Sequence, residues 1–230
     1  MKVLIIIPAY NEELNIERVV SNLTENFPNY DYVVVNDGSK DNTALICKEK
    51  GYNFLDLPVN LGLTGAIQAG MRYAYQNGYD AAIQFDGDGQ HRPEYISELE
   101  KVIESGEAEV AIGSRFVEEK KPHSLRMLGS NLISLLIKLT TGRTIKDPTS
   151  GMRLFGRRVI REFAENINFA PEPDTISYLM KNGVSIKEVQ VVMDERVAGE
   201  SYLNFGKSMK YMLQQCFSIV FIQAFRKGMK

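Results

Sequence analysis

The segment "VLIIIPAYNEE", residues 3–13, carries the strongest information about the fold. Its first five residues are apolar and mostly β-branched, which is typical of a strand buried on both faces of a sheet. Pro8 is expected to end this strand, and a polar segment follows it. A dinucleotide-binding fold would need a G-x-G-x-x-G loop here. Because the loop is "PAYNEE" instead, and no Walker-type loop or G-x-S-x-G elbow occurs elsewhere, the segment indicates another kind of α/β protein.

Apolar runs and helical patterns continue to alternate as far as residue 112. Further buried strands are expected at residues 32–35, 54–57, 81–85 and 110–112. Helices are expected at residues 16–27, with Asn11 as the cap, and at 43–50, 62–78 and 94–104. Strands that alternate with helices predict a parallel sheet with right-handed crossovers.

Polar or glycine residues follow each expected strand directly. In parallel sheets the functional residues gather on the loops at the carboxyl ends of the strands. We therefore expect the site to be formed by the loops at residues 8–12, 36–39, 58–62, 86–90 and 113–115.

The second half of the chain has a different pattern. Residues 124–141 predict an amphipathic helix with basic flanks, residues 147–155 ("DPTSGMRLF") a turn and a short strand, residues 177–181 a helix, and residues 184–193 a strand. The apolar face of the first of these helices comprises Leu125, Leu128, Leu132, Leu135, Leu136 and Leu139. The tail begins at residue 208 and ends in basic residues. Its apolar stretch is too short to span a bilayer. It is interpreted as an interfacial membrane helix, an oligomer contact, or a helix packed on its own core.

Charge is distributed unevenly along the chain. The net charge of −2 combines −10 in residues 1–114, +8 in residues 115–161 and zero in residues 162–230. A basic middle segment indicates an anionic partner such as phosphate or a membrane surface, or simply a solvated face. Two distant cysteines indicate a reducing compartment, and two histidines exclude a histidine-rich metal site. The short apolar run at the N-terminus does not predict a signal peptide.

The segment "QFDGDGQH", residues 84–91, places two carboxylates two residues apart. In an extended chain Asp86 and Asp88 point the same way, and two such carboxylates bind a hard divalent cation. That cation would bridge a diphosphate and neutralise charge on a departing nucleotide. The D-x-D pattern alone is weak, because many acidic turns contain it.

Several motifs together resemble those of one family. "IIIPAYNEE" (5–13), "VVVNDGSKDNT" (33–43), "NLGLTGAIQAG" (60–70), "QFDGDGQH" (84–91) and "GSR" (113–115) occur in the order and spacing of the family 2 inverting glycosyltransferases, and "DPTSGMRLF" and "RVAGES" (196–201) resemble later segments of that family. Within it, the chain is most similar to the dolichol- and polyprenyl-phosphate sugar transferases. The resemblance implies a GT-A α/β fold, in which helices flank a mostly parallel central sheet.

The resemblance also implies an organisation along the chain. Residues 1–205 would form the GT-A catalytic domain, with a nucleotide-sugar-binding half at 1–115 and an acceptor-binding half at 116–205. Residues 206–230 would form an amphipathic helix for contact with a membrane surface or a second subunit.

For the donor side, the resemblance implies a set of binding residues. Tyr10 would lie against the base, with Glu12 and Asp37 on base or ribose, Asp86 on the donor sugar or ribose, and Asp88 on the metal ion with help from Gln90. The nucleotide-sugar-binding set is Pro8, Ala9, Tyr10, Glu12, Asp37, Asn60, Gly62, Asp86, Gly87, Asp88 and Arg115. Leu63 stands where family members often carry a lysine.

For the acceptor side, Arg115, Arg126 and Ser130 resemble the phosphate-binding group of the polyprenyl-phosphate enzymes. Arg126 and Ser130 are four residues apart, so a helix would place them on one face. Arg196 and Ser201 match a loop expected to close over the diphosphate.

The function implied is the metal-dependent, inverting transfer of a sugar from a nucleotide-diphospho-sugar to a polyprenyl phosphate. One alternative is transfer to a hydroxyl of a lipid-linked or cell-surface polysaccharide, which needs a carboxylate base. Asp174 or Glu172, in "PEPDT", would then be that base, or else an acidic cap of the next helix. A second alternative is a nucleotide-sugar-binding scaffold subunit without activity. A sugar-phosphate nucleotidyltransferase is disfavoured, because "PAYNEE" is not the glycine- and arginine-rich loop it would need.

The expected cofactor is Mg²⁺ or Mn²⁺, and the expected donor a UDP-, GDP- or dTDP-sugar. Expected partners are a lipid phosphate and a membrane surface or membrane protein. Formation of a homo-oligomer is left open, and no nucleic-acid partner is expected. The expected location is the cytoplasm, at the inner face of the cell membrane.

Overall fold

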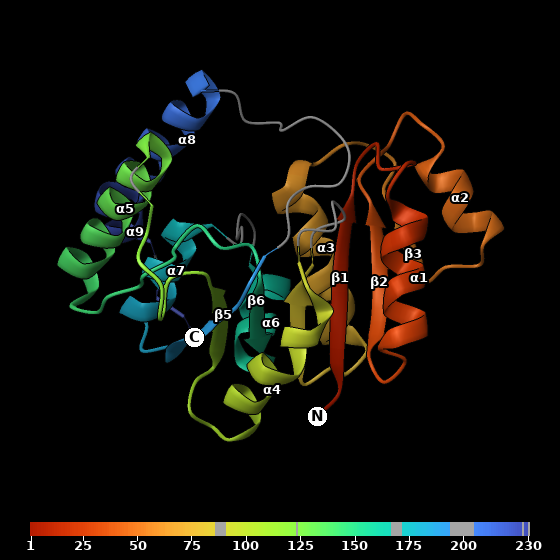
Figure 1. The fold of residues 1–230 in the computed structure, drawn as a ribbon, viewed down its shortest axis with the longest axis horizontal. Helices are drawn as coiled ribbons and strands as arrows, with labels where there is room; N and C mark the ends of the chain where they lie inside the picture. Colours follow the sequence, from red (N-terminus) through yellow and green to blue (C-terminus); the bar gives the residue numbers. More distant parts are fainter. Residues whose placement is uncertain (86–90, 123, 167–171, 194–204, 227, 230) are drawn as a thin grey trace.

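The computed structural model describes residues 1–85, 91–122, 124–166, 172–193, 205–226 and 228–229. Within them, seven strands form one sheet in the order β3-β2-β1-β4-β6-β5-β7 (Figure 1). The strands are β1 (Val3–Ala9), β2 (Asp31–Asn36), β3 (Phe54–Asp56), β4 (Ala81–Gln84), β5 (Val110–Ser114), β6 (Arg153–Gly156) and β7 (Ile186–Gln190). Three pairs of neighbouring strands, β3–β2, β2–β1 and β1–β4, are parallel. The mostly parallel sheet predicted from the sequence is therefore confirmed.

One strand runs against the others. β6 lies between β4 and β5 and pairs antiparallel with both, while β5 pairs parallel with β7 on its other side. The sheet thus continues across the first and second halves of the chain without a break.

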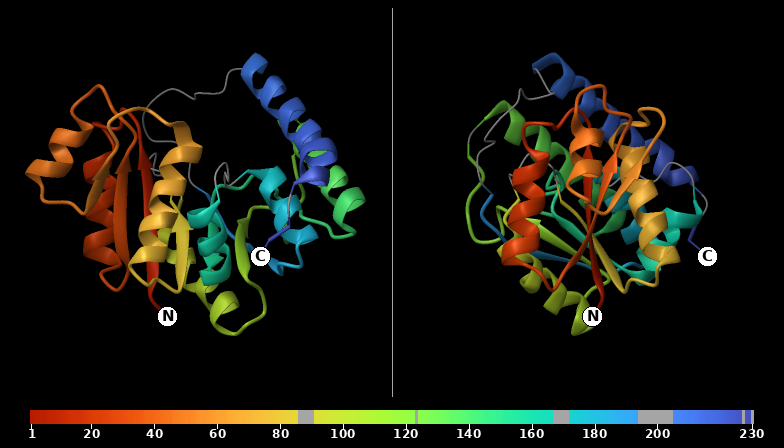
Figure 2. Two further views of the ribbon diagram at one scale, coloured as in Figure 1. Left: turned by 180° about the vertical axis from the view of Figure 1, so that it is seen from behind. Right: turned by 90° about the vertical axis from the view of Figure 1, so that its right-hand side faces the viewer.

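Helices cover both faces of the sheet. They are α1 (Ile16–Asn26), α2 (Thr43–Glu49), α3 (Gly62–Gln76), α4 (Ile96–Glu104), α5 (Leu125–Thr141), α6 (Arg157–Glu165), α7 (Pro173–Lys181), α8 (Phe205–Phe217) and α9 (Gln223–Phe225), with a 3₁₀ turn η1 (Pro93–Tyr95) before α4 and a π-helical segment η2 (Ser218–Ile222) between α8 and α9. Apolar residues of α1 and α4 pack on one face, and those of α3 and α6 on the other (Figure 2).

β1 shows why this layering follows from the sequence. Its residues alternate between the two cores, with Leu4 and Ile6 in one and Val3, Ile5 and Ile7 in the other. All five are buried, as expected for a wholly apolar strand in the middle of a sheet.

The expected role of Asn11 as a helix cap is wrong. α1 begins at Ile16 with Asn15 as the capping residue, and Asn11 lies in the loop before it with a φ of 56°. There the Asn11 side chain accepts a hydrogen bond from the backbone N–H of Lys40 (2.9 Å). Asn11 therefore connects two strand-end loops.

A further group of helices lies beyond the β5 side of the sheet. In Figure 1, α5, α8 and α9 form a layer at the edge opposite β3, and α5 contacts both α7 and α8. Met127, Ile133 and Ile137 turn inward from α5. Four of the six leucines of the expected apolar face are exposed instead, namely Leu128, Leu132, Leu135 and Leu139. In the part of the chain described here, no helix combines the length and apolarity needed to cross a bilayer.

Candidate active site

The carboxyl ends of β1 and β2 bring the first two predicted loops together. β1 and β2 are parallel and in register up to the pair Ala9–Asn36. The backbone N–H of Asp37 then donates to the carbonyl oxygen of Ala9 (2.8 Å). Tyr10, the next residue, is 43% exposed, so its ring is accessible to a ligand at this edge.

Asp37 joins a third loop to this pair. Its carboxylate is buried, and Oδ1 accepts a hydrogen bond from the backbone N–H of Leu61 (2.7 Å). Leu61 precedes α3 and lies between Asn60 and Gly62, the two predicted residues of that loop. The structure therefore brings together the loops of Ala9, Asp37 and Asn60, as the sequence predicts.

Glu12 lies in the same group of loops. Its backbone N–H donates to Thr43 Oγ1 (2.9 Å), and its Oε2 accepts from Asn15 Nδ2 (2.8 Å). Both contacts hold the β1 loop against the start of α1 and α2. The carboxylate is thereby oriented before any ligand arrives, which lowers the conformational cost of binding.

The predicted metal-binding residues follow β4 in the sequence, and β4 ends at this edge of the sheet. β4 lies beside β1, and Phe85 continues it through a backbone hydrogen bond to the carbonyl oxygen of Ile6 (2.9 Å). Asp86, Gly87, Asp88 and Gln90 lie outside the described residues. His91, the next described residue, is buried and edge-on to the Phe85 ring (5.5 Å between centroids).

The donor atoms in this segment fit a hard divalent cation. Carboxylate oxygens such as those of Asp86 and Asp88 are the ligands that Mg²⁺ and Mn²⁺ prefer. Within the described ranges, no cluster of three or more histidine, cysteine or acidic side chains offers a competing metal site.

On the acceptor side, Arg115 is engaged in an ion pair. Its Nε and Nη2 donate to the two carboxylate oxygens of Asp147 at 2.8 and 2.9 Å, and its backbone N–H also donates to Asp147. Asp147 is completely buried, and its pKa is lowered because these hydrogen bonds outweigh the effect of burial. This pair ties the end of β5 to the "DPTSGMRLF" segment.

Lys121 is a candidate residue that the sequence reasoning missed. Its Nζ donates to Oγ of Ser130, which is buried on the inner side of α5 (3.0 Å). Burial lowers the pKa of Lys121, while the nearby charges of Asp147 and Glu188 oppose this shift. An incompletely solvated ammonium beside a hydroxyl offers donors to an anion. The basic pair at 120–121 was the only signal in the sequence, and it does not distinguish the half-buried lysine from the exposed one.

Other predicted acceptor residues are only partly located. Arg126 lies in the first turn of α5, four residues before Ser130, but its side chain is not described. Arg196 and Ser201 lie outside the described residues.

Both candidate bases contact the C-terminal helices. Glu172 Oε2 accepts a hydrogen bond from the Tyr211 hydroxyl, and burial raises the pKa of Glu172. Asp174 lies in the first turn of α7, where its Oδ2 accepts from Ser218 Oγ (2.6 Å) and Gln223 Nε2 (3.0 Å).

A buried arginine lies near these acids. Arg153 on β6 is almost fully buried and donates to the carbonyl oxygen of Pro148 (2.7 Å). Burial lowers its pKa, and the charges of Glu172, Asp147 and Asp174 oppose that shift. The sequence placed this arginine on a strand without indicating its burial.

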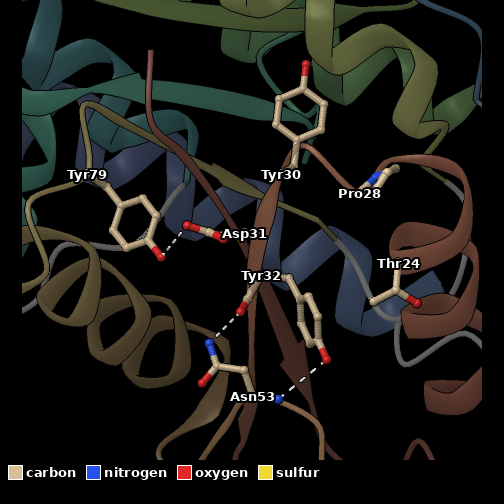
Figure 3. Close-up of a pocket in the computed structure, with 7 residues that line it drawn as sticks. All are labelled: Thr24, Pro28, Tyr30, Asp31, Tyr32, Asn53 and Tyr79. Atoms are coloured by element: carbon tan, nitrogen blue, oxygen red, sulfur yellow. Dashed lines mark hydrogen bonds between the residues drawn. The ribbon is translucent and has the colours of Figure 1, made fainter.

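A separate hollow of about 290 Å³ lies at the other end of the sheet (Figure 3). It is formed around the start of β2 by Thr24, Pro28, Tyr30, Asp31, Tyr32, Asn53 and Tyr79. The Tyr79 hydroxyl donates to Asp31 (3.0 Å), and Asn53 Nδ2 donates to the carbonyl oxygen of Tyr32 (2.7 Å). Since these groups bond to one another at the amino end of the strands, the hollow is separate from the candidate site.

Comparisons with known proteins agree with this arrangement. The family model described as "Glycosyl transferase family 2" matches residues 4–163. A UDP-N-acetylglucosamine–dolichyl-phosphate N-acetylglucosaminyltransferase of Methanococcus voltae is 33% identical, over 81% of this chain and 83% of its own length. An undecaprenyl-phosphate mannosyltransferase of Micrococcus luteus is 31% identical, over 90% of this chain and 89% of its own length.

A solved structure confirms the GT-A fold. Glucosyl-3-phosphoglycerate synthase from Mycobacterium tuberculosis, in complex with Mn²⁺, UDP-glucose and phosphoglyceric acid, aligns with a TM-score of 0.70 at 16% identity. The alignment covers 98% of this chain and 81% of that one.

Proposed function

This chain belongs to glycosyl transferase family 2, and we propose that it transfers a sugar from a nucleotide-diphospho-sugar to a polyprenyl phosphate. The two relatives described above support this choice of acceptor, since each is named for a dolichyl or undecaprenyl phosphate. The net charge of +8 in residues 115–161 supports it independently, because an anionic acceptor is attracted to that segment.

The proposed chemistry is a single displacement with inversion. An oxygen of the lipid phosphate attacks the anomeric carbon of the donor sugar. The bond from that carbon to the diphosphate oxygen breaks, and the nucleoside diphosphate leaves with the electron pair. The attacking phosphate is already an anion, so no base has to remove a proton.

The engagement of both candidate bases is the observation that carries the proposal. A hydroxyl acceptor would need Asp174 or Glu172 to accept its proton. Asp174 accepts hydrogen bonds at both carboxylate oxygens: Oδ2 from Ser218 and Gln223, and Oδ1 from the backbone N–H of Thr175 (2.8 Å). Glu172 accepts a hydrogen bond from the Tyr211 hydroxyl. These contacts support a structural role for the two acids at the C-terminal helices, and they thereby favour the acceptor that needs no base.

Lys121, Ser130 and Arg126 are the proposed phosphate-binding group. Lys121 and Ser130 already share a hydrogen bond, and Arg126 is one helical turn from Ser130. The donor would be held by the loops of Tyr10, Asp37 and Asn60.

A divalent ion, Mg²⁺ or Mn²⁺, completes the proposal. Asp88 would hold it, with Gln90 beside it, and Asp86 would orient the donor sugar. When bound, the ion neutralises charge that develops on the leaving diphosphate. The loop containing Arg196 and Ser201 would close over the diphosphate.

The test supplies purified full-length protein with polyprenyl phosphate, Mg²⁺ or Mn²⁺, and a panel of UDP-, GDP- and dTDP-sugars. Free nucleoside diphosphate and glycolipid are measured together. We expect turnover on the lipid phosphate and its loss in Asp88→Ala. Turnover on a lipid-linked glycan but not on the lipid phosphate would overturn the proposal in favour of the hydroxyl acceptor.

Neighbouring lysines supply a matched pair of variants. Lys121→Ala is expected to raise the KM for the lipid phosphate by roughly ten- to hundredfold, because a charge-assisted hydrogen bond of about 1.5–3 kcal/mol is lost. Lys120→Ala removes the same charge at an exposed position and is expected to change the KM little. Equal effects of the two variants would show that only the overall charge matters.

A further inference from the structure

The C-terminal helices present apolar side chains to the outside. On the inner side, Tyr211, Gln215, Ser218 and Gln223 hydrogen-bond to Glu172 or to Asp174, and Ile219 is buried among them. A helix packed on a protein in water normally has polar residues on the opposite side. Here the outer side includes six apolar residues that are 41% to 90% exposed, namely Met209, Leu213, Phe217, Phe221, Ile222 and Phe225.

Helix α5 adds a second apolar stripe beside the first. Leu128, Leu132, Leu135 and Leu139 follow one another at steps of four, three and four residues, so they lie on one side of the helix. Ile133 and Ile137 are buried on its other side. α5 and α8 are in direct contact (Figure 1). Gly129 of α5 lies so close to Met212 of α8 that an added Cβ would meet the Met212 sulfur. The two stripes, called here the outer apolar face, are therefore neighbours.

The two segments that form this face carry positive charge and no negative charge. Residues 120–146 contain six lysines and arginines, and residues 201–230 contain five. Neither segment contains an aspartate or a glutamate. Lys138, Arg143 and Lys210 are exposed on or beside the same helices. This contrasts with residues 1–114, where acidic residues predominate.

We propose that the outer apolar face binds the surface of an anionic lipid bilayer. Leucine and phenylalanine side chains on one side of a helix enter the boundary between headgroups and acyl chains, and lysines and arginines beside them attract anionic lipid. A second copy of the chain would fit less well, because a two-fold contact would bring two purely basic segments together. Charge therefore selects the bilayer as the occupant.

This surface rests on its own observations and goes beyond the proposed transfer reaction. If both hold, α5 has two roles, since Ser130 lies on its inner side and the leucine stripe on its outer side. The proposed phosphate-binding group would then lie within one helix diameter of the bilayer surface, about 10 Å.

The experiment measures flotation of the full-length protein with phosphatidylcholine vesicles that either contain or lack phosphatidylglycerol. Binding is expected only with phosphatidylglycerol and is expected to weaken as salt is added. Phe217→Glu and Leu135→Glu are each expected to lower the partition coefficient by roughly ten- to hundredfold, because a large apolar side chain no longer enters the interface. The matched control is Leu45→Glu on α2, which replaces a leucine that is 50% exposed, as Leu135 is, and should bind as wild type.

Turnover is measured in parallel on a short-chain acceptor dispersed in detergent, so that a failure of the proposed reaction is seen separately from a failure of vesicle binding. Three results would overturn the inference. These are equal binding to uncharged vesicles, equal loss of binding in Leu45→Glu, and a vesicle-independent dimer that Leu135→Glu dissociates. Circular dichroism of each variant excludes a loss of folding as the cause.

Discussion

Gly38 has almost no room for a side chain in the proposed donor site. Its φ is +64°, and an added Cβ would lie 2.7 Å from both the carbonyl carbon of Val59 and the backbone nitrogen of Asn60. Both neighbours are backbone atoms, so a side chain here has to push the Asn60 loop away from Asp37. The sequence marked this glycine as part of a loop, but the approach of residues 59–60 depends on the tertiary fold.

Gly38→Ala is therefore expected to raise the KM for the nucleotide-sugar and to lower the melting temperature. The matched control is Gly51→Ala, where φ is +66° but nothing lies within 4 Å of the added Cβ. Both variants carry the cost of a left-handed alanine, about 1 kcal/mol, and only Gly38→Ala adds the clash. Equal effects of the two variants on the KM would contradict the assigned loop contact.

The Arg115–Asp147 pair should make the stability of the folded protein depend on pH. Because the pKa of Asp147 is lower in the folded protein than in the unfolded chain, the pair's stabilisation is fully present above about pH 4 and is lost as the pH falls through the folded-state pKa. Asp147→Asn should lower the free energy of unfolding by about 3–5 kcal/mol at neutral pH. The variant's free energy of unfolding should also fall less steeply as the pH is lowered. Urea denaturation between neutral and acidic pH measures both effects. Glu25→Gln, at an exposed position, is the control, and an unchanged acid slope in Asp147→Asn would contradict the prediction.

Helix α3 is held close to β1 by a glycine. A Cβ added at Gly70 would lie 2.4 Å from Cγ2 of Ile6, which is completely buried. Overpacking of this kind costs about 1–3 kcal/mol, and alanine's better helix propensity offsets about 1 kcal/mol of it. Gly70→Ala is therefore expected to lower the free energy of unfolding by up to about 2 kcal/mol, as measured in urea.

A double-mutant cycle isolates this contact. In an Ile6→Ala background the space is open, so Gly70→Ala should no longer be destabilising and should be stabilising through helix propensity. A cost that is the same in both backgrounds would mean that the spacing of α3 and β1 is set elsewhere.

Strands and helices of the first half were predictable because each has its own period in the sequence. β1 is apolar at every position, and α1 and α4 repeat at helical spacing, so burial follows directly from the pattern. The direction of α5 was not predictable in this way. In the sequence the leucine stripe is the more apolar side of this helix, yet Met127, Ile133 and Ile137 face the core. Helix periodicity reveals that two sides differ, but it does not identify which of two apolar sides meets protein.

The loops of the proposed donor site were predictable for a topological reason. Parallel strands bring their following loops to one edge, so Ala9, Asp37 and Asn60 had to meet once the strand pattern was recognised. Lys121 and the acids at 172 and 174 lie on irregular segments or helix ends. Their partners are 9 and 39 to 49 residues away in the sequence, and no periodic pattern links them.

At the scale of the whole molecule, the two predicted halves of the chain share one sheet. β5 belongs to residues 1–115, but both of its partner strands, β6 and β7, come from residues 116–205. β6 also pairs with β4, so the second half supplies hydrogen bonds to two strands of the first. A chain divided at residue 115 would leave β5 without a partner, and an unpaired strand buried on both faces is strongly unfavourable.

We therefore expect the full chain to unfold in a single cooperative transition. The calorimetric and van't Hoff enthalpies should agree, and loss of the β-sheet signal should coincide with loss of tertiary structure around the tyrosines. A fragment of residues 1–115 should lack this transition, although it contains most of the proposed donor-binding residues, because β4 and β5 cannot be completed within it. Two separate transitions in the full chain, or native-like donor binding by the fragment, would show instead that the donor half folds by itself and that the antiparallel insertion of β6 adds only stability.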